Sequence, residues 1–308
     1  MLQGRYHVPV LLNETVNALN IFPGGTYVDC TFGGGGHSAA ILDKLDSGGR
    51  LIAFDQDAAA SKNLPKDERI MFVPHNFRHI SRFLKFHHHP KVNGILADLG
   101  VSSHQIDKAE RGFSTRFDAF LDMRMNQSQD LDAAKIVATY TEEKLHKIFE
   151  EYGEVTNSKT LAKLIVATRR TQPIKSIAEF KRALYDIVKG NPEKYFAKVF
   201  QALRIEVNDE LGALKELVTQ VPDLLMEGGR AVFITFHSLE DRIVKNFFRY
   251  GHFEERQNDN VYGIPAETTL KVISKKTVVP SDEEMKANPR SRSAKLRVAE
   301  KVSNSDLK

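Results

Sequence analysis

The chain has 308 residues, is 41% hydrophobic and carries a formal net charge of +4. This hydrophobic content can supply a packed core, which excludes a mainly disordered protein. The single cysteine, Cys30, excludes a disulfide scaffold. The first residues lack the pattern of a secretion signal, and no apolar run is long enough to span a bilayer. We therefore expect a cytoplasmic protein with no membrane association.

The first hundred residues predict a parallel sheet. Short segments rich in β-branched or apolar residues occur over 26–31, 50–55, 70–74 and 92–98, and helical patterns over 37–45 and 77–87. Strands that alternate with helices in this way are typical of βαβ units.

The pattern becomes helical after Asp98. A polar loop over 102–130 precedes helices that begin after Thr141, over 158–170, from Ser176 to Lys189, and over 200–225. Strand patterns return over 229–236, 270–274 and 294–299. We predict the α/β class: a doubly wound, Rossmann-like domain (1–106 and 206–308) with an inserted all-helical domain (107–205).

Positive charge is concentrated in this insertion. Residues 156–205 hold eleven Lys or Arg against three acidic residues, a balance of +8, so the rest of the chain is slightly acidic. Such a concentration indicates a polyanion partner, and a solvated helical face is the alternative interpretation.

A glycine-rich turn is the strongest single motif. Four glycines, 33–36, follow the first predicted strand and precede a helix, and Asp55 ends the next strand. Glycines let a ligand approach the backbone, and a carboxylate in the position of Asp55 can accept the hydroxyls of a ribose. These features predict an adenosine-type cofactor, while a structural glycine turn is the alternative.

Two residues favour S-adenosylmethionine over NAD. Ser38 stands where a dinucleotide fingerprint has its third glycine, and the carboxylate of Asp29 would repel a pyrophosphate but tolerate a sulfonium and an ammonium. Tyr140 and Lys144 match the Tyr-x-x-x-Lys pair of short-chain dehydrogenases, but Thr141 between them is a typical helix N-cap, so we interpret the match as chance.

Asp98 ends the fourth predicted strand, followed by Leu-Gly-Val. Amino-methyltransferases have an acid, Asn or Ser there that accepts hydrogen bonds from the target amine, although the usual Pro-Pro-aromatic turn is missing here. Acceptors on an exocyclic amine would localise its lone pair and orient it toward a methyl donor. Asp98 is therefore our candidate catalytic residue, and a role in cofactor contact alone is the alternative.

Eight segments in order match one known family. They are residues 7–14 (HVPVLLNE), 29–38 (DCTFGGGGHS), 98–103 (DLGVSS), 110–114 (ERGFS), 121–125 (LDMRM), 200–205 (FQALRI), 235–242 (TFHSLEDR) and 290–297 (RSRSAKLR). Together they resemble the RsmH (MraW) family, the bacterial 16S ribosomal RNA cytosine N4-methyltransferases. The resemblance implies a class I methyltransferase sheet with a helical insertion, and transfer from S-adenosylmethionine to N4 of a decoding-centre cytosine in the small subunit.

The resemblance also implies particular residues. The family's cofactor contacts fall on Gly35, Gly36, His37, Asp55, Phe77, Asp98 and Gln105. The chain departs from the family's pattern over 191–198 and at Asn126, which puts fine RNA contacts in doubt but not the reaction. The sequence is compatible with a homodimer.

RNA-contact candidates combine guanidinium groups for phosphate with an aromatic ring for base stacking. They are Arg111, Phe113, Arg124, His237, Arg290 and Arg292. Internal Arg–Asp pairs are the alternative for the loop 110–125, and a structural hydrogen bond is the alternative for His237. The adjacent histidines 87–89 do not share a helical face, so we predict no metal.

Two other classes of function remain at this stage: an NAD-linked oxidoreductase, and a non-catalytic RNA-binding assembly factor that keeps a cofactor fold. We favour the assembled small subunit over naked RNA as substrate, because a single target base demands a large structured context.

Overall fold

The computed structural model describes residues 9–254, 268–273 and 276–303. Residues 7 and 8 of the first motif, and residue 274 of the strand expected over 270–274, lie outside these ranges. The chain forms two compact units, one comprising Met1–Gly100 with Leu211–Lys308 and the other Val101–Glu210. The insertion that the sequence predicts, 107–205, lies within the second unit and is a few residues shorter at each end.

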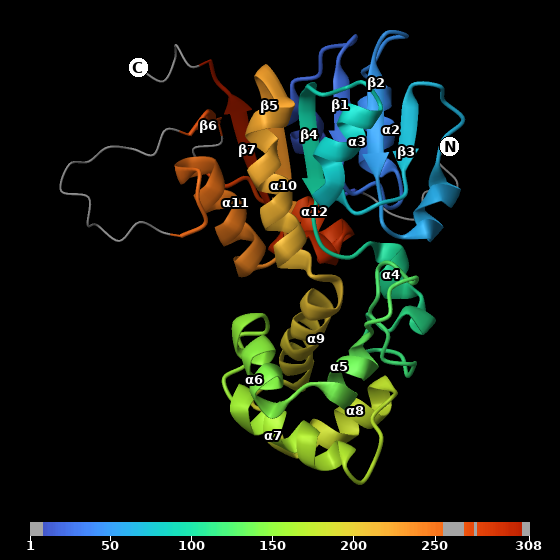
Figure 1. Cartoon of the computed structure of the whole chain (residues 1–308), viewed down its shortest axis with the longest axis vertical. Coiled ribbons are helices and arrows are strands. Elements are labelled where there is room, and N and C mark those ends of the chain that lie inside the picture. Colours follow the sequence, from blue (N-terminus) through green and yellow to red (C-terminus); the bar gives the residue numbers. More distant parts are fainter. Residues whose placement is uncertain (1–8, 255–267, 274–275, 304–308) are drawn as a thin grey trace, which may run out of the picture. The chain divides into compact units, whose positions relative to one another are not determined.

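The first unit contains a seven-stranded sheet in the order β3-β2-β1-β4-β5-β7-β6 (Figure 1). The strands are β1 (Thr26–Asp29), β2 (Arg50–Phe54), β3 (Ile70–Val73), β4 (Val92–Asp98), β5 (Leu225–Thr235), β6 (Leu270–Val272) and β7 (Lys295–Lys301). The first five are parallel, whereas β7 pairs antiparallel with both β5 and β6. This order, which runs outward from β1 in both directions, confirms the predicted doubly wound α/β class.

Successive residues of the central strands point to opposite faces of the sheet, and both faces are covered. Val28 and Ile95 belong to a core shared with α3, α10 and α11, while Tyr27 and Leu96 belong to a core shared with α1 and α2. Helices on both faces explain why these strands read as continuous apolar runs. The helices of this unit are α1 (Leu12–Leu19), α2 (Gly36–Leu42), α3 (Ile80–Phe86), α10 (Glu210–Leu224), α11 (Ser238–Tyr250) and α12 (Asp282–Ala287), with short 3₁₀ turns η1 (Ala58–Asn63), η2 (Phe77–His79) and η5 (Pro289–Ser293).

The second unit is helical and has a core of its own, which includes Phe149, Phe180 and Leu203. Its elements are α4 (Ser103–Asp107), η3 (Ala109–Arg111), α5 (Ala133–Thr139), α6 (Glu142–Glu151), α7 (Ser158–Arg169), α8 (Ile177–Leu184), η4 (Tyr185–Ile187) and α9 (Pro192–Asn208). The predicted N-caps are confirmed, because the hydroxyl of Thr141 accepts from the Lys144 N–H and that of Ser176 from the Glu179 N–H.

Three expectations for the helical unit were wrong in detail. The loop expected over 102–130 contains α4, which a capping box between Ser102 and Gln105 begins. The helix expected from Ser176 to Lys189 ends at Leu184 and continues as a 3₁₀ turn. The helix expected over 200–225 is two helices, because Asp209 adopts a left-handed conformation with φ 47° and ends α9.

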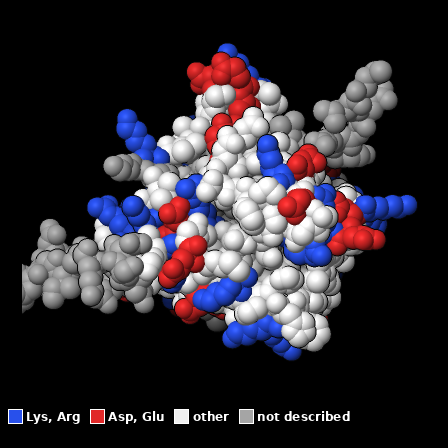
Figure 2. All heavy atoms as spheres, turned by 90° about the horizontal axis from the view of Figure 1, so that it is seen from above, with Lys and Arg blue, Asp and Glu red and all other residues white. Residues whose placement is uncertain are grey.

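Within the described parts of the chain, no helix combines the length and the apolar character needed to cross a membrane. Figure 2 shows one face of the molecule, on which the basic and acidic side chains of the described residues are interspersed. Such a mixture is typical of a solvated surface.

Candidate functional site

The glycine turn joins β1 to α2 and leaves its backbone open on one side. Gly33 and Gly35 have positive φ values of 50° and 74°, which residues with a side chain rarely adopt. A Cβ atom on Gly34 would have no atom of the described residues within 4 Å, whereas one on Gly36 would lie 2.3 Å from Cγ of Pro9. The predicted cofactor contacts Gly35 and Gly36 are therefore glycines for local steric reasons, and the open space lies over Gly34.

Asp55, which follows β2, is tied to this turn. Its Oδ2 accepts from the N–H of Gly33 at 2.8 Å, and its Oδ1 accepts from the N–H of Asp57 at 2.8 Å. Burial raises the pKa of Asp55 to about 6, although both backbone hydrogen bonds oppose the rise. Each oxygen keeps further acceptor capacity, which the predicted contact with ribose hydroxyls would use.

Asp29 lies at the end of β1 and is 1% exposed. Its Oδ2 accepts from the hydroxyl of Ser38 at 2.7 Å, and its Oδ1 accepts from the N–H of Thr31 at 3.0 Å. Burial raises its pKa, and the hydrogen bond from Ser38 partly offsets that rise. A glycine at position 38 could not donate this hydrogen bond to Asp29, which explains the departure from the dinucleotide fingerprint.

Asp98, the candidate catalytic residue, ends β4 next to β1. Its N–H donates to Oγ1 of Thr31 at 2.7 Å. Its Oδ1 is buried and has no hydrogen-bond partner among the residues that the structure describes. Burial, reinforced by the negative charges of Asp29 and Glu240, raises the pKa of Asp98 well above its usual range. A buried acceptor without a donor indicates a place that a ligand completes.

His37, in the first turn of α2, is 6% exposed and faces Asp98. Its Nδ1 lies 3.6 Å from Oδ2 of Asp98, and its Nε2 lies 3.0 Å from the carbonyl oxygen of Val10. The sequence indicated these two residues separately, as cofactor contacts. Their pairing was missed, because 61 residues separate them along the chain.

The other two predicted cofactor contacts have different surroundings. Phe77 begins η2 and is half-buried against the core of the sheet unit. Gln105 belongs to the helical unit, where its Oε1 accepts from the N–H of Ser102 at 3.0 Å in the capping box. This bond fixes the start of α4, and a role for Gln105 at the cofactor remains a prediction.

The arginines predicted to contact RNA hold their own loop together. Arg111 is 3% exposed and donates to the carbonyl oxygens of Arg124 and Met125. Arg124 makes a two-pronged ion pair with Asp122, with nitrogen–oxygen distances of 2.7 and 3.0 Å. This geometry favours the alternative interpretation, in which internal pairs order the loop. Phe113 is half-buried against the helical core.

The same loop presents other side chains that the sequence analysis missed. Phe117 and Phe120 are 40% and 46% exposed, and the guanidinium of Arg116 lies 5.6 Å from the ring centre of Phe117. A backbone hydrogen bond anchors the loop to the residues before α8, because the N–H of Leu121 donates to the carbonyl oxygen of Lys175 at 2.9 Å. Only the tertiary fold distinguishes these outward phenylalanines from Phe113.

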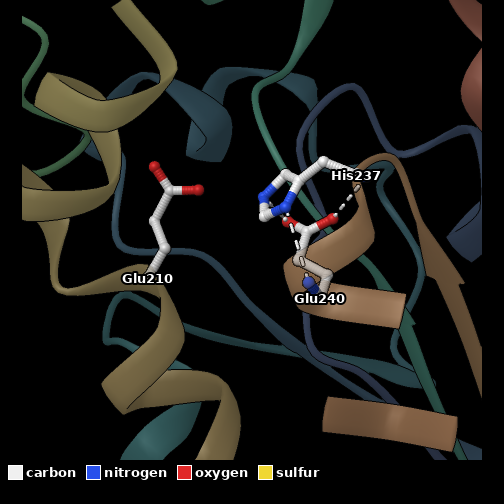
Figure 3. Close-up of side chains that lie close together, drawn as sticks. All are labelled: Glu210, His237 and Glu240. Carbon is white, nitrogen blue, oxygen red and sulfur yellow. Dashed lines mark hydrogen bonds and ion pairs between the residues drawn. The ribbon is translucent and has the colours of Figure 1, made fainter. Parts of the chain in front are cut away.

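His237 caps α11. Its Nδ1 accepts from the N–H of Glu240 at 3.4 Å, while Oε2 of Glu240 accepts from the N–H of His237 at 3.4 Å (Figure 3). This capping box favours the structural interpretation of His237. Glu210, also drawn in Figure 3, is the last residue of the helical unit and the first residue of α10, and it pairs with Arg204 at 2.8 Å.

The basic residues near the C-terminus differ in their surroundings. Arg290 and Arg292 lie in η5, with Arg292 exposed. Arg297 on β7 forms a two-pronged pair with Asp241, with nitrogen–oxygen distances of 2.9 and 3.0 Å, and Lys295 lies 3.3 Å from the same carboxylate. Burial alone would raise the pKa of Asp241, but these cations lower it.

A doubly wound sheet with an antiparallel β7, a glycine turn after β1 and acids at the ends of β1 and β4 is the architecture of a Rossmann-like methyltransferase. The chain belongs to the MraW methylase family, whose model matches residues 4–302.

Named relatives agree with this assignment. Proteins called ribosomal RNA small subunit methyltransferase H from Bacteroides fragilis (strain YCH46) and from Flavobacterium johnsoniae are each 52% identical, over 297 and 304 residues. The matches cover 96% of this chain and 97% and 98% of the relatives. Among solved structures, a putative rRNA methylase from Clostridium thermocellum has a TM-score of 0.45 and 12% identity, covering 96% of this chain and 100% of that one.

Proposed function

We propose that this protein transfers a methyl group from S-adenosylmethionine to the exocyclic N4 of a decoding-centre cytosine in 16S ribosomal RNA. The names of its relatives and the eight motifs support an rRNA substrate. The observation that carries the chemistry is the buried Oδ1 of Asp98 at the end of β4, which has no hydrogen-bond partner within the described ranges. A carboxyl group there offers the hydrogen-bond acceptor that an aromatic amine needs.

The residues present fit S-adenosylmethionine. The open side of Gly34 leaves room for a ligand against the backbone, and Asp29 suits the positive charges of its ammonium and sulfonium. When bound, this cofactor supplies an electrophilic methyl group. The residues that would hold it are Gly35, Gly36, His37, Asp55, Phe77, Asp98 and Gln105.

Asp98 positions the amine. The lone pair of N4 is conjugated with the cytosine ring, so acceptors for its two hydrogens would localise that pair and direct it at the methyl group. The carbonyl of Leu99 is our candidate for the second acceptor. Cys30 is 2% exposed, and burial together with the charge of Asp29 raises the pKa of its thiol. It is therefore a poor nucleophile, which argues against a cysteine adduct and methylation at C5.

The helical unit is our candidate for the RNA-recognition domain. It holds the segment 156–205 with its +8 balance, and its loop exposes Phe120 and also Phe117, which lies beside Arg116. Exposed aromatic rings can stack on unpaired bases while a guanidinium contacts phosphate. Arg292 remains a candidate for phosphate contact, whereas Arg111, Arg124 and His237 act in the scaffold. The substrate would be the assembled small subunit, in the cytoplasm.

Small subunits from cells that lack the gene, incubated with the protein and labelled S-adenosylmethionine, test the proposal. Nuclease digestion and mass spectrometry should identify N4-methylated cytidine at one decoding-centre position. Label at another atom or base, or no label in RNA despite cofactor binding, would contradict the proposed reaction. Asp98→Ala separates an enzyme from a non-catalytic assembly factor, because only the enzyme would lose product while still binding RNA.

A further inference from the structure

The surroundings of His37 determine which of its ring nitrogens carries a proton. Nε2 lies 3.0 Å from the carbonyl oxygen of Val10, and a carbonyl oxygen can only accept a hydrogen bond. Nε2 is therefore protonated, and the neutral imidazole has its lone pair on Nδ1. That lone pair faces Oδ2 of Asp98 across 3.6 Å.

The carboxyl group of Asp98 is poorly suited to act as a base alone. Its burial and the charges of Asp29, from β1, and Glu240, from α11, favour its neutral form. A neutral carboxyl group can accept a hydrogen bond, but it takes up a proton only if it passes its own proton on. Oδ2 of Asp98 lies 3.6 Å from Nδ1 of His37, so His37 is placed to accept that proton.

We infer that His37 is the proton acceptor behind Asp98, and that through Asp98 it removes the proton which the methylated amine must lose. This inference rests on the proposed function, amine methylation at Asp98. In the step, the bond from N4 to the methyl carbon forms as the sulfur–carbon bond breaks. One N4 proton moves to Oδ1 of Asp98, the oxygen without a hydrogen-bond partner among the described residues, as the proton on Oδ2 moves to Nδ1 of His37. The positive charge of the sulfonium thus ends on the imidazolium.

The environment suits a cationic His37 after the reaction. The carboxylate of Asp29 interacts attractively with His37, and Val10 still accepts from Nε2. Asp98 begins and ends neutral, so no additional buried carboxylate has to be stabilised. His37 acts through Asp98 and is thus a positioning and proton-accepting residue. We expect its contact with the cofactor to involve the backbone in the first turn of α2, which His37→Asn retains.

The decisive variant is His37→Asn, with His88→Asn as the matched control at an exposed histidine of the same unit. In His37→Asn, kcat should fall about 100-fold, the lower end of the range for general acid–base catalysis. The acidic limb of the kcat–pH profile should disappear, while affinity for S-adenosylhomocysteine, measured by calorimetry, stays within about twofold. His88→Asn should match the wild type in all three measurements.

A readout independent of turnover uses the unliganded wild-type protein. Nitrogen-15 NMR of histidine-labelled protein should show His37 protonated at Nε2 and unprotonated at Nδ1 near neutral pH. The opposite tautomer, or a His37→Asn variant with an unchanged acidic limb, overturns the inference. If instead Asp98→Ala keeps wild-type methylation, or the wild type methylates no RNA, the proposed function itself fails.

Discussion

The hydroxyl of Ser38 lies 2.7 Å from Oδ2 of Asp29 and links the first turn of α2 to the end of β1. Asp29 is 1% exposed, so loss of this donor would leave a buried carboxyl oxygen with a weaker set of partners. The glycine turn runs between these two residues, and their bond helps to fix its two ends.

Ser38→Ala should therefore lower the free energy of unfolding by about 1–3 kcal/mol, the cost of an unsatisfied buried polar group. Urea unfolding at neutral pH measures it. Ser61→Ala is the control, because the hydroxyl of Ser61 donates only to the carbonyl of Ala58 in an exposed turn. Equal effects of the two substitutions on the free energy of unfolding would show that the Ser38–Asp29 hydrogen bond stabilises the fold no more than an exposed one.

Gly34 and Gly36 should respond differently to substitution by alanine. Gly36→Ala places a Cβ atom 2.3 Å from Pro9 and should destabilise the fold by about 1–3 kcal/mol, as overpacking does. Gly34→Ala meets no atom within 4 Å in the part of the chain that the structure describes, and should leave stability within about 0.5 kcal/mol of the wild type. Gly34→Ala should nevertheless weaken cofactor binding in calorimetry by about tenfold or more, because the methyl group occupies the open side of the turn. Unchanged affinity would place the cofactor elsewhere.

Asp55 should make stability fall as the pH rises. Its pKa is about 6 in the folded protein and about 4 in the unfolded chain, so the folded state binds the extra proton between these values. The neutral form of Asp55 therefore contributes up to about 2–3 kcal/mol to the free energy of unfolding. This contribution is fully present below about pH 4 and is lost as the pH rises through about 6. Asp55→Asn should flatten the profile of unfolding free energy over this window. A profile as steep as that of the wild type would rule out Asp55 as its source.

The pair of Asp241 and Arg297 should have the opposite pH dependence. The pKa of Asp241 is lowered, so its contribution is present above about pH 4 and lost as the pH falls through the folded value. Arg297→Met should cost about 3 kcal/mol at pH 7, because a largely buried carboxylate loses its two-pronged partner. The cost should shrink at pH 3 in urea unfolding. A cost that does not change with pH would indicate packing, not charge.

Phe117 and Phe120 should contribute to RNA binding without affecting the fold. Replacing either by alanine should weaken binding to a single-stranded rRNA fragment by about 1–3 kcal/mol, the value of one base stacked on an aromatic ring. Phe86→Ala is the control, since Phe86 is 73% exposed but lies in the sheet unit. Fluorescence anisotropy measures the affinity, and equal binding by Phe117→Ala, Phe120→Ala and the control would remove the loop from the RNA surface.

Interactions between residues close together in the sequence made several strands, helix starts and the glycine turn predictable. Apolar runs over 26–31 and 92–98 predicted buried parallel strands, and the hydroxyls of Thr141 and Ser176 predicted helix starts, because both signals depend on residues a few positions apart. The glycine turn and the acids at strand ends were predictable for the same reason. The left-handed Asp209 was not, since aspartate has no strong preference for that conformation.

What each polar side chain does was decided by the tertiary structure. Arg124 and Arg116 are equivalent in the sequence, yet one holds the loop through Asp122 and the other lies beside the exposed ring of Phe117. His37 and Asp98 meet only because β1 and β4 are neighbours in the sheet. Periodicity and capping are encoded over short distances along the chain, whereas the partner of a buried charge is fixed by which strands pair, and that depends on the packing of the whole domain.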